Sequence, residues 1–177
     1  MAEIKTILTD YPVATVEDVY DQLPDDSKRR DKSIIPGADE FSKKWLDEPY
    51  DRKPIKKGNA SYFTLKGDYV RSKSELIIAD RLWANGIPYK YECPILVDGE
   101  IIHPDFTILR IRDRKIIYHE HCGMIDDAEY SEKLTDRVNR YSREGIVLGD
   151  RLFLSFETSK KPLDVCVIDR LINTHFR

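Results

Sequence analysis

The chain has few of the residues that build disulfide scaffolds, and no long hydrophobic run. Its 177 residues include three cysteines, Cys93, Cys122 and Cys166, which are too widely spaced for a paired zinc motif. No apolar stretch approaches the length of a membrane span, and the first residues lack the hydrophobic core of a signal peptide. We therefore expect reduced thiols, no contact with a membrane and a cytoplasmic location.

An excess of basic residues is also missing. The formal net charge is −3, which by itself predicts no nucleic-acid partner. Residues 1–50 hold 12 acidic against 7 basic residues, giving −5, whereas residues 51–177 hold 20 against 22, giving +2. The acidic charge is thus concentrated in the N-terminal part, and the 41% of hydrophobic residues is enough for one core.

The sequence divides into an expected N-terminal extension, residues 1–60, and an expected α/β domain, residues 61–177. Within the extension we expect short helices, one from Thr15 to about Leu23 and one over Ala38–Leu46.

The pattern of residues 61–177 alternates between helical and strand periodicity. It predicts a helix over 72–85, a strand over 89–97 that Pro94 partly breaks, a hairpin turn at Asp98-Gly99, a helix over 129–143, a strand over 151–156 and a last helix from Pro162 to about His175. This order is typical of a mixed central β-sheet flanked by helices.

The central feature is a predicted β-hairpin. Two arms rich in β-branched and aromatic residues, 103–109 and 115–123, flank the charged segment 110–114, which is typical of an exposed turn. Folding the hairpin brings Asp105, at the start of one arm, towards Glu120, near the end of the other.

Strand alternation then assigns the neighbours of Glu120 to two faces. One face carries Tyr118, Glu120 and Cys122, and the other carries Ile117, His119 and His121. Two carboxylates inside apolar runs are costly to bury unless a cation lies between them, and a divalent metal is the usual cation.

These residues occur in a wider set of motifs. In order along the chain the motifs are Tyr69–Glu75, Gly86–Glu92, His103–Thr107 and Glu120–Met124. The set resembles a bacterial and phage group of the PD-(D/E)xK nuclease superfamily, over about Tyr62 to the C-terminus. The resemblance implies a restriction-endonuclease-like core in which Asp105 and Glu120 hold Mg²⁺ or Mn²⁺ beside a phosphodiester bond of a nucleic acid, for which we expect DNA.

One position departs from the family pattern. The superfamily has a lysine two residues after the glutamate, whereas this chain has Cys122 within Glu-His-Cys-Gly. A thiol offers no persistent cation near pH 7, so the cation must come from elsewhere. Some members place it on the following helix, where Lys133 is our candidate and Arg137 the next. The alternative is that these charges form only a solvated helix face.

Glu75 has both a structural and a functional interpretation. Glu75 completes a Ser-Lys-Ser-Glu capping box with Ser72, whereas the resemblance places it near the metal, as a further ligand directly or through water. The histidines next to Glu120 provide too few ligands for zinc. The residues expected to contact nucleic acid are Arg71, Lys133, Arg137 and Arg140.

The sequence thus predicts a metal-dependent nuclease with Asp105, Glu120, Glu75 and Lys133 as its catalytic residues. The alternative is a nuclease-like module that has lost catalysis and binds nucleic acid or a protein partner, which the cysteine in place of lysine favours.

Overall fold

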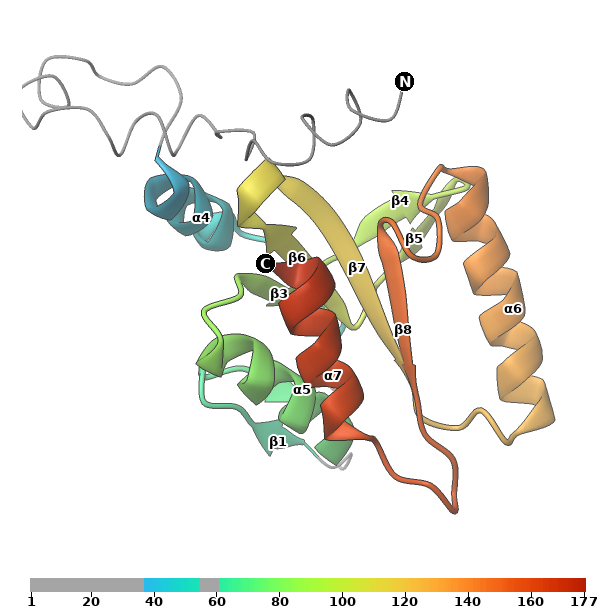
Figure 1. Ribbon diagram of the computed structural model, residues 1–177. Helices are drawn as coiled ribbons and strands as arrows, with labels where there is room; N and C mark the ends of the chain where they lie inside the picture. The colour runs from blue at the N-terminus through green and yellow to red at the C-terminus, as the bar shows by residue number, and fades with distance from the viewer. Residues whose placement is uncertain (1–36, 55–60) are drawn as a thin grey trace, which may run out of the picture. The chain divides into compact units, whose positions relative to one another are not determined.

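Figure 1 shows a computed structural model of the chain, which describes residues 37–54 and 61–177. The helix expected from Thr15 to about Leu23 lies outside these residues. The second expected helix is confirmed as α4 (Ala38–Asp47).

Residues Leu46–Arg177 form one compact unit. The unit includes residues 46–54, which the sequence pattern places in the extension. Tyr50 shows how this segment is attached: its hydroxyl donates a hydrogen bond to the carbonyl of Tyr91, 3.0 Å away. Residues 46–54 therefore contribute to the packing of the α/β unit.

The central sheet contains β3 (Tyr89–Tyr91), β6 (Phe106–Arg110), β7 (Lys115–Cys122) and β8 (Leu152–Phe156), in the order β3-β6-β7-β8. The first three strands pair antiparallel, and β8 pairs parallel with β7. The expected mixed α/β architecture is confirmed. The expected hairpin is also confirmed, with the short 3₁₀ helix η1 (Ile111–Asp113) in its turn.

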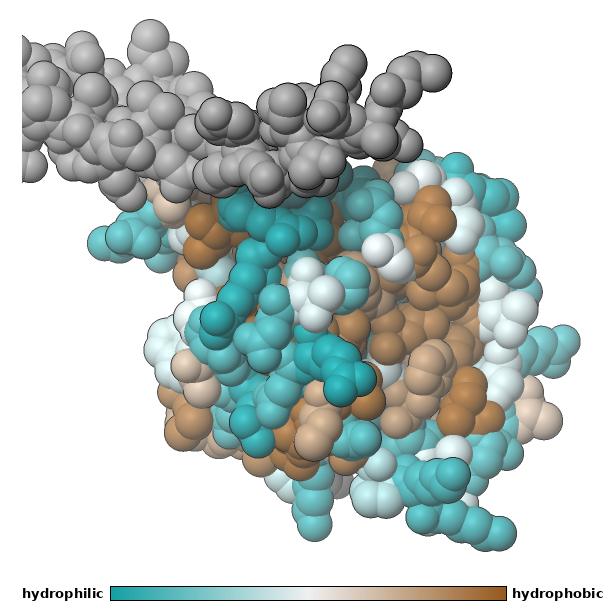
Figure 2. Space-filling view, viewed as in Figure 1, coloured by the Kyte–Doolittle hydropathy of each residue, from teal (hydrophilic) through white to brown (hydrophobic). Residues whose placement is uncertain are grey.

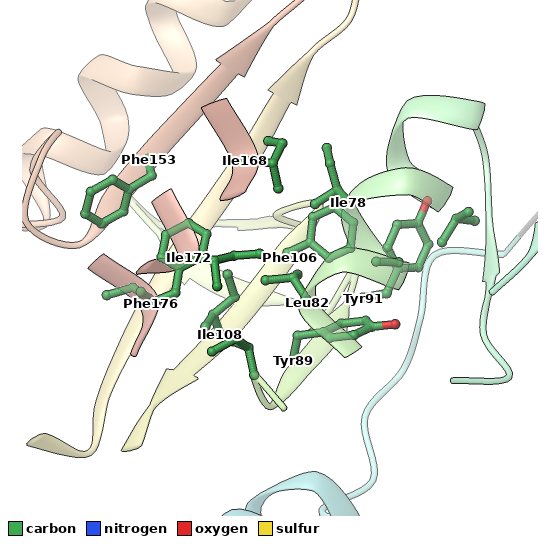
Figure 3. Close-up of a cluster of buried hydrophobic side chains, with 14 residues drawn as sticks. Ile78, Leu82, Tyr89, Tyr91, Phe106, Ile108, Phe153, Ile168, Ile172 and Phe176 are labelled. Atoms are coloured by element: carbon green, nitrogen blue, oxygen red, sulfur yellow. The ribbon is translucent and has the colours of Figure 1, made fainter. Parts of the chain in front are cut away.

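Helices cover both faces of this sheet (Figure 1). On one face lie α5 (Lys73–Ala84) and α7 (Val165–Leu171), and on the other lies α6 (Ala128–Arg143). Figure 3 shows the core between the sheet, α5 and α7, where Ile78, Phe106 and Ile168 are fully buried. A second core contains Tyr118 and Tyr141 and lies on the α6 face.

Two small hairpins accompany the central sheet: β1 (Tyr62–Phe63) with β2 (Tyr69–Val70), and β4 (Ile95–Val97) with β5 (Glu100–Ile102). The second turns at Asp98 and Gly99, as expected, and both residues have the positive φ angles that such a tight turn requires.

The expected strand over 89–97 is two strands in different sheets. The chain turns at Glu92, which has a φ of 48°. Both carboxylate oxygens of Glu92 accept hydrogen bonds from the Arg71 guanidinium, at 2.7 and 2.9 Å, and Pro94 has no N–H for a strand ladder. This ion pair holds the chain in the bend that separates β3 from β4.

Helix ends follow their capping residues. The Ser72 side chain caps α5, and Gly86, just beyond its end, has a φ of 66°. The last helix begins at Val165, later than the expected start at Pro162, because the Asp164 side chain accepts the N–H of Cys166 at 2.9 Å. It continues as a π-helical turn, η2 (Ile172–Phe176).

The edge strand β8 has a hydrophobic surface beside it. Figure 2 shows this surface between β8 and α6, and the exposed large hydrophobic residues in and next to β8 are Val147, Leu148 and Phe156. Within the part of the chain that the structure describes, every helix is too short or too polar to cross a membrane.

His119 is a fully buried imidazole in the core between the sheet and α7. Its ring stacks on Phe106, with centroids 6.0 Å apart, and also contacts Phe176. Neither ring nitrogen has a hydrogen-bond partner within the described residues. Burial therefore lowers the pKa of His119 to about 3, so the folded state holds it neutral.

Replacing His119 with leucine should reduce the loss of stability in acid. In the unfolded chain the imidazole takes up a proton as the pH falls below about 6.5, whereas the folded chain takes it up only near pH 3. The free energy of unfolding of the wild type should therefore lose up to about 1.4 kcal/mol more per pH unit than that of His119→Leu between these values. Urea denaturation at several pH values measures this difference.

The matched control is His103→Leu, because the ring of His103 is partly exposed. If the pH profiles of His119→Leu and the wild type ran parallel, the buried imidazole would not be a source of acid sensitivity.

Candidate functional site

The hairpin brings Asp105 and Glu120 together at adjacent strand ends. Asp105 directly precedes β6, and the register Phe106↔His119 sets it opposite Glu120 on β7. The Asp105 Oδ2 accepts the backbone N–H of His121 at 2.7 Å, which fixes the carboxylate against β7. The expected proximity of the two carboxylates is confirmed, and it follows directly from strand pairing.

Glu120 points to the α6 face of the sheet and is only 4% exposed. Its Oε1 accepts the hydroxyl hydrogen of Tyr141 at 2.7 Å, and its Oε2 lies 3.1 Å from Nη1 of Arg137. Both partners belong to α6 and are four residues apart, so they lie on one face of the helix. One helix therefore supplies a neutral and a charged donor to a single buried carboxylate.

Glu75 confirms the capping box and also lies near the two carboxylates. Its Oε2 accepts the backbone N–H groups of Arg71, at 2.8 Å, and Ser72, at 3.3 Å, while the Ser72 hydroxyl accepts the N–H of Glu75. The same oxygen accepts the Tyr91 hydroxyl at 2.6 Å. The Glu75 charge is close enough to raise the pKa of Asp105. The structural interpretation of Glu75 is therefore compatible with the functional one.

Negative charge accumulates where these carboxylates meet. Burial raises the pKa of Asp105 well above its ordinary value, and the charges of Glu120 and Glu75 raise it further. Burial also raises the pKa of Glu120, although Arg137 and Tyr141 oppose that rise. A bound cation would relieve this repulsion, because it favours the ionised form of every carboxylate around it.

Arg137 is the basic side chain that the structure brings to the carboxylates. The Glu120 charge raises the pKa of its guanidinium, and 47% of the side chain remains exposed, so it also faces solvent. Lys133, our first candidate from the sequence, lies elsewhere: its Nζ pairs with Glu129 at 2.5 Å, and the side chain is 72% exposed. That pair spans one turn of α6, and it holds the ammonium on the outer surface of the helix.

The other two basic residues predicted to contact nucleic acid are in ion pairs. Arg140 forms an ion pair with Glu100 of the β4–β5 hairpin, and Arg71 forms the bidentate ion pair with Glu92 described above. The charge of each is therefore partly neutralised within the fold.

Cys122 lies on the same face as Glu120, as strand alternation predicts. It is 1% exposed, and burial, together with the charges of Glu120 and Asp105, raises the pKa of its thiol to about 12. The thiol is therefore neutral at physiological pH. Burial, together with Cys122 and Asp105, also raises the pKa of Tyr130 on α6 to about 12.

The two histidines next to Glu120 point to the opposite face, as expected. His119 is in the core. His121 forms a hydrogen bond with the Ser155 hydroxyl, with 2.9 Å between Nδ1 and Oγ. Nε2 of His121 lies 3.3 Å from Oε1 of Glu157.

Three partners of the site do not follow from the sequence pattern as we interpret it. The pattern assigns no role at the carboxylates to Tyr141, Tyr91 or Glu157. The spacing of Arg137 and Tyr141 is nevertheless a usable signal, since residues four apart share a helix face. For Tyr91 and Glu157 the sequence carries no such signal, because their partners are distant in the chain.

A divalent metal is compatible with this donor set. Among residues 37–54 and 61–177, no group of three or more His, Cys, Asp or Glu side chains is arranged to hold a metal ion. Mg²⁺, however, is commonly held by one or two carboxylates, with water and phosphate completing its octahedron. Each ionised carboxylate has about four acceptor positions, so Asp105 and Glu120 keep acceptor capacity beyond their present hydrogen bonds.

Comparison with known proteins adds no family or function to this description. No protein-family model, no curated protein and no solved structure matches the chain.

Proposed function

We propose that the chain is a metal-dependent nuclease that hydrolyses phosphodiester bonds in nucleic acid, for which we expect DNA. The observation that carries the proposal is the pair of carboxylates, Asp105 and Glu120, held at adjacent strand ends beside the exposed guanidinium of Arg137. The ordered motifs that resemble the PD-(D/E)xK superfamily support the same assignment.

Asp105 and Glu120 would hold Mg²⁺ or Mn²⁺, with Glu75 as a further ligand, directly or through water. When bound, the ion would polarise the phosphate and lower the pKa of its bound water. The protein contributes the position of the ligands: the His121 N–H orients Asp105, the Tyr141 hydroxyl orients Glu120, and the helix cap orients Glu75.

Arg137 would supply the cation that Cys122 does not. A guanidinium stays protonated at any relevant pH, so Arg137 would offset negative charge on the phosphate but would not accept a proton from water. Its hydrogen bond to Glu120 uses one of five N–H donors, and the exposed part of the group can reach a phosphate oxygen. The role that we expected of Lys133 is thus better suited to its neighbour one turn along α6.

The second candidate function is that of a nuclease-like module without catalysis, which binds nucleic acid or a protein partner. One observation favours it: both oxygens of Glu120 already have donors from α6. Internal neutralisation of this kind would let the fold keep a buried carboxylate without a metal.

Metal binding should depend on the two strand carboxylates. Mn²⁺ should raise the melting temperature of the wild type, because a ligand that binds only the folded state stabilises it by mass action. The double variant Asp105→Asn with Glu120→Gln should lose this shift. Without metal it should be at least as stable as the wild type at pH 7.5, since burial raises the pKa of both groups and the neighbouring carboxylates raise that of Asp105 further. Thermal melts with and without Mn²⁺ measure both effects.

The matched control is Glu132→Gln with Asp136→Asn, two exposed changes on α6 that should leave the shift intact. The shift in the wild type should also be smaller at pH 5.5 than at pH 7.5, because protons compete for Asp105. A folded site variant with the full Mn²⁺ shift would rule out Asp105 and Glu120 as ligands.

Arg137→Ala should lower the cleavage rate on the order of 100-fold, because it removes a positive charge aimed at the phosphate. Lys133→Ala is the matched comparison one turn away and should stay near the wild-type rate, since its ammonium pairs with Glu129. Arg137→Lys should retain part of the activity by keeping a point charge.

These rates are measured on a plasmid and on oligonucleotides with Mn²⁺, at a temperature where circular dichroism shows each variant folded. A large loss in Lys133→Ala with normal activity in Arg137→Ala would return the role to the lysine.

If the wild type cleaves no DNA or RNA, nucleic-acid affinity tests whether the second candidate function is the binding of nucleic acid. A binding module that contacts the backbone through Lys133, Arg137 and Arg140 should bind more weakly as salt rises, because binding releases counterions. Replacing all three with alanine should flatten the dependence of log affinity on log salt. Equal slopes for this variant and the wild type would show that the face does not contact the backbone.

A further inference from the structure

A cluster of polar side chains lies on the sheet face opposite Glu120. It consists of Ser74 on α5, His121 on β7, Ser155 on β8 and Glu157, the residue that follows β8, and we call it the Glu157 cluster. The serines and the histidine are at most 9% exposed. Buried polar groups on three elements are costly unless they are satisfied together, so their arrangement is specified closely.

Glu157 is the centre of this cluster. Its Oε2 accepts the Ser74 hydroxyl at 2.7 Å and the backbone N–H of Leu163 at 3.1 Å, and its Oε1 lies 3.3 Å from Nε2 of His121. Burial raises the pKa of Glu157, but the hydrogen bond from Ser74 and the nearby His121 outweigh it and leave the pKa below its ordinary value. Glu157 is thus ionised and shared by α5, β7 and the segment before α7.

The backbone on either side of the Glu157 cluster leaves space for the Glu157 carboxylate. The N–H of Glu157 donates to the carbonyl of Cys122 at 3.0 Å, which extends the β7–β8 pairing beyond the end of β8. A Cβ at Gly123 would lie 3.3 Å from Oε1 of Glu157, tighter than ordinary contact. The glycine therefore leaves room for Glu157 beside His121.

Two partners of Glu157 adjoin residues of the carboxylate site. Ser74 directly precedes Glu75 on α5. His121 directly follows Glu120, and its own N–H holds Asp105. The side chain of Glu157 therefore connects the helix that carries Glu75 with the strand that carries Glu120.

We infer that Glu157 is a positioning residue for the carboxylate site: it fixes the first turn of α5 against β7 and so sets the spacing of Glu75 from Asp105 and Glu120. This inference rests on the proposed function, because the spacing matters for a metal held among these carboxylates. Glu157 itself faces away from Glu120 and ligates nothing. Groups that hydrogen-bond a metal ligand directly change metal affinity about 10- to 100-fold when they are removed, and Glu157 acts one contact further away, so its effect should be smaller.

The experiment measures Mn²⁺ affinity directly, from the electron paramagnetic resonance signal of free Mn²⁺, on folded full-length protein. Glu157→Ala should weaken binding by up to about 10-fold, the lower end of the effect for groups that contact a ligand directly. Glu157→Gln should weaken it less, because an amide oxygen can still accept from Ser74 and Leu163. Ser74→Ala should also weaken it, and adding Ser74→Ala to Glu157→Ala should cost little more, since the two act through one contact.

Glu132→Gln, an exposed change of the same type, is the matched control and should bind as the wild type does. A purely structural role would lower the melting temperature and leave the Mn²⁺ affinity of the folded variants unchanged, which would overturn the inference while the proposed function stood. A wild type that binds no Mn²⁺ would overturn both. If Glu157→Ala fails to fold, unchanged affinity in Glu157→Gln and Ser74→Ala would overturn the inference in its place.

Discussion

Two carboxylates lie on adjacent strands of one sheet with little water to solvate them, and much of the surrounding structure compensates for their burial. Asp105 takes a backbone N–H, Glu120 takes a hydroxyl and a guanidinium, and Glu75 takes the N–H groups of a helix cap. These donors belong to β7 for Asp105, to α6 for Glu120 and to the N-terminal cap of α5 for Glu75. The packing of α5 and α6 on opposite faces of the sheet therefore has an electrostatic role as well as a hydrophobic one.

The compensation is incomplete, and that is why the site is a functional candidate. In a purely structural cluster one would expect donors to match acceptors and pKa values to remain low, as they do at Asp113 beside Arg110. Here the pKa of Asp105 stays raised because the group is buried and because the charges of Glu120 and Glu75 raise it further, against the opposing effect of Arg137. Strongly perturbed carboxylates at a strand end are more often found at functional sites, although ion-pair networks also produce them.

Local patterns predicted much of this fold. The hairpin, both capped helices and the faces of β7 follow from alternation, capping residues and turn residues, which depend on neighbours in the chain. The break at Glu92 did not follow, because it depends on Arg71, and the start of α7 was set by Asp164 rather than by Pro162. The site shows the same division. Asp105 and Glu120 meet through strand register, whereas the choice of Arg137 over Lys133 depends on how α6 is rotated against the sheet.

The β4–β5 hairpin gives α6 a second attachment. Arg143 pairs with Asp98, Arg140 with Glu100, and Glu144 accepts the N–H of Asp98 at 3.0 Å, while Val97 packs with Tyr141 in the second core. These contacts couple the β4–β5 hairpin to α6, so that a tilt of one element would displace the other. Because Arg137 and Tyr141 move with α6, such a tilt would withdraw both donors from Glu120 at once. The charge state of the buried Glu120 is thus linked to the position of the β4–β5 hairpin.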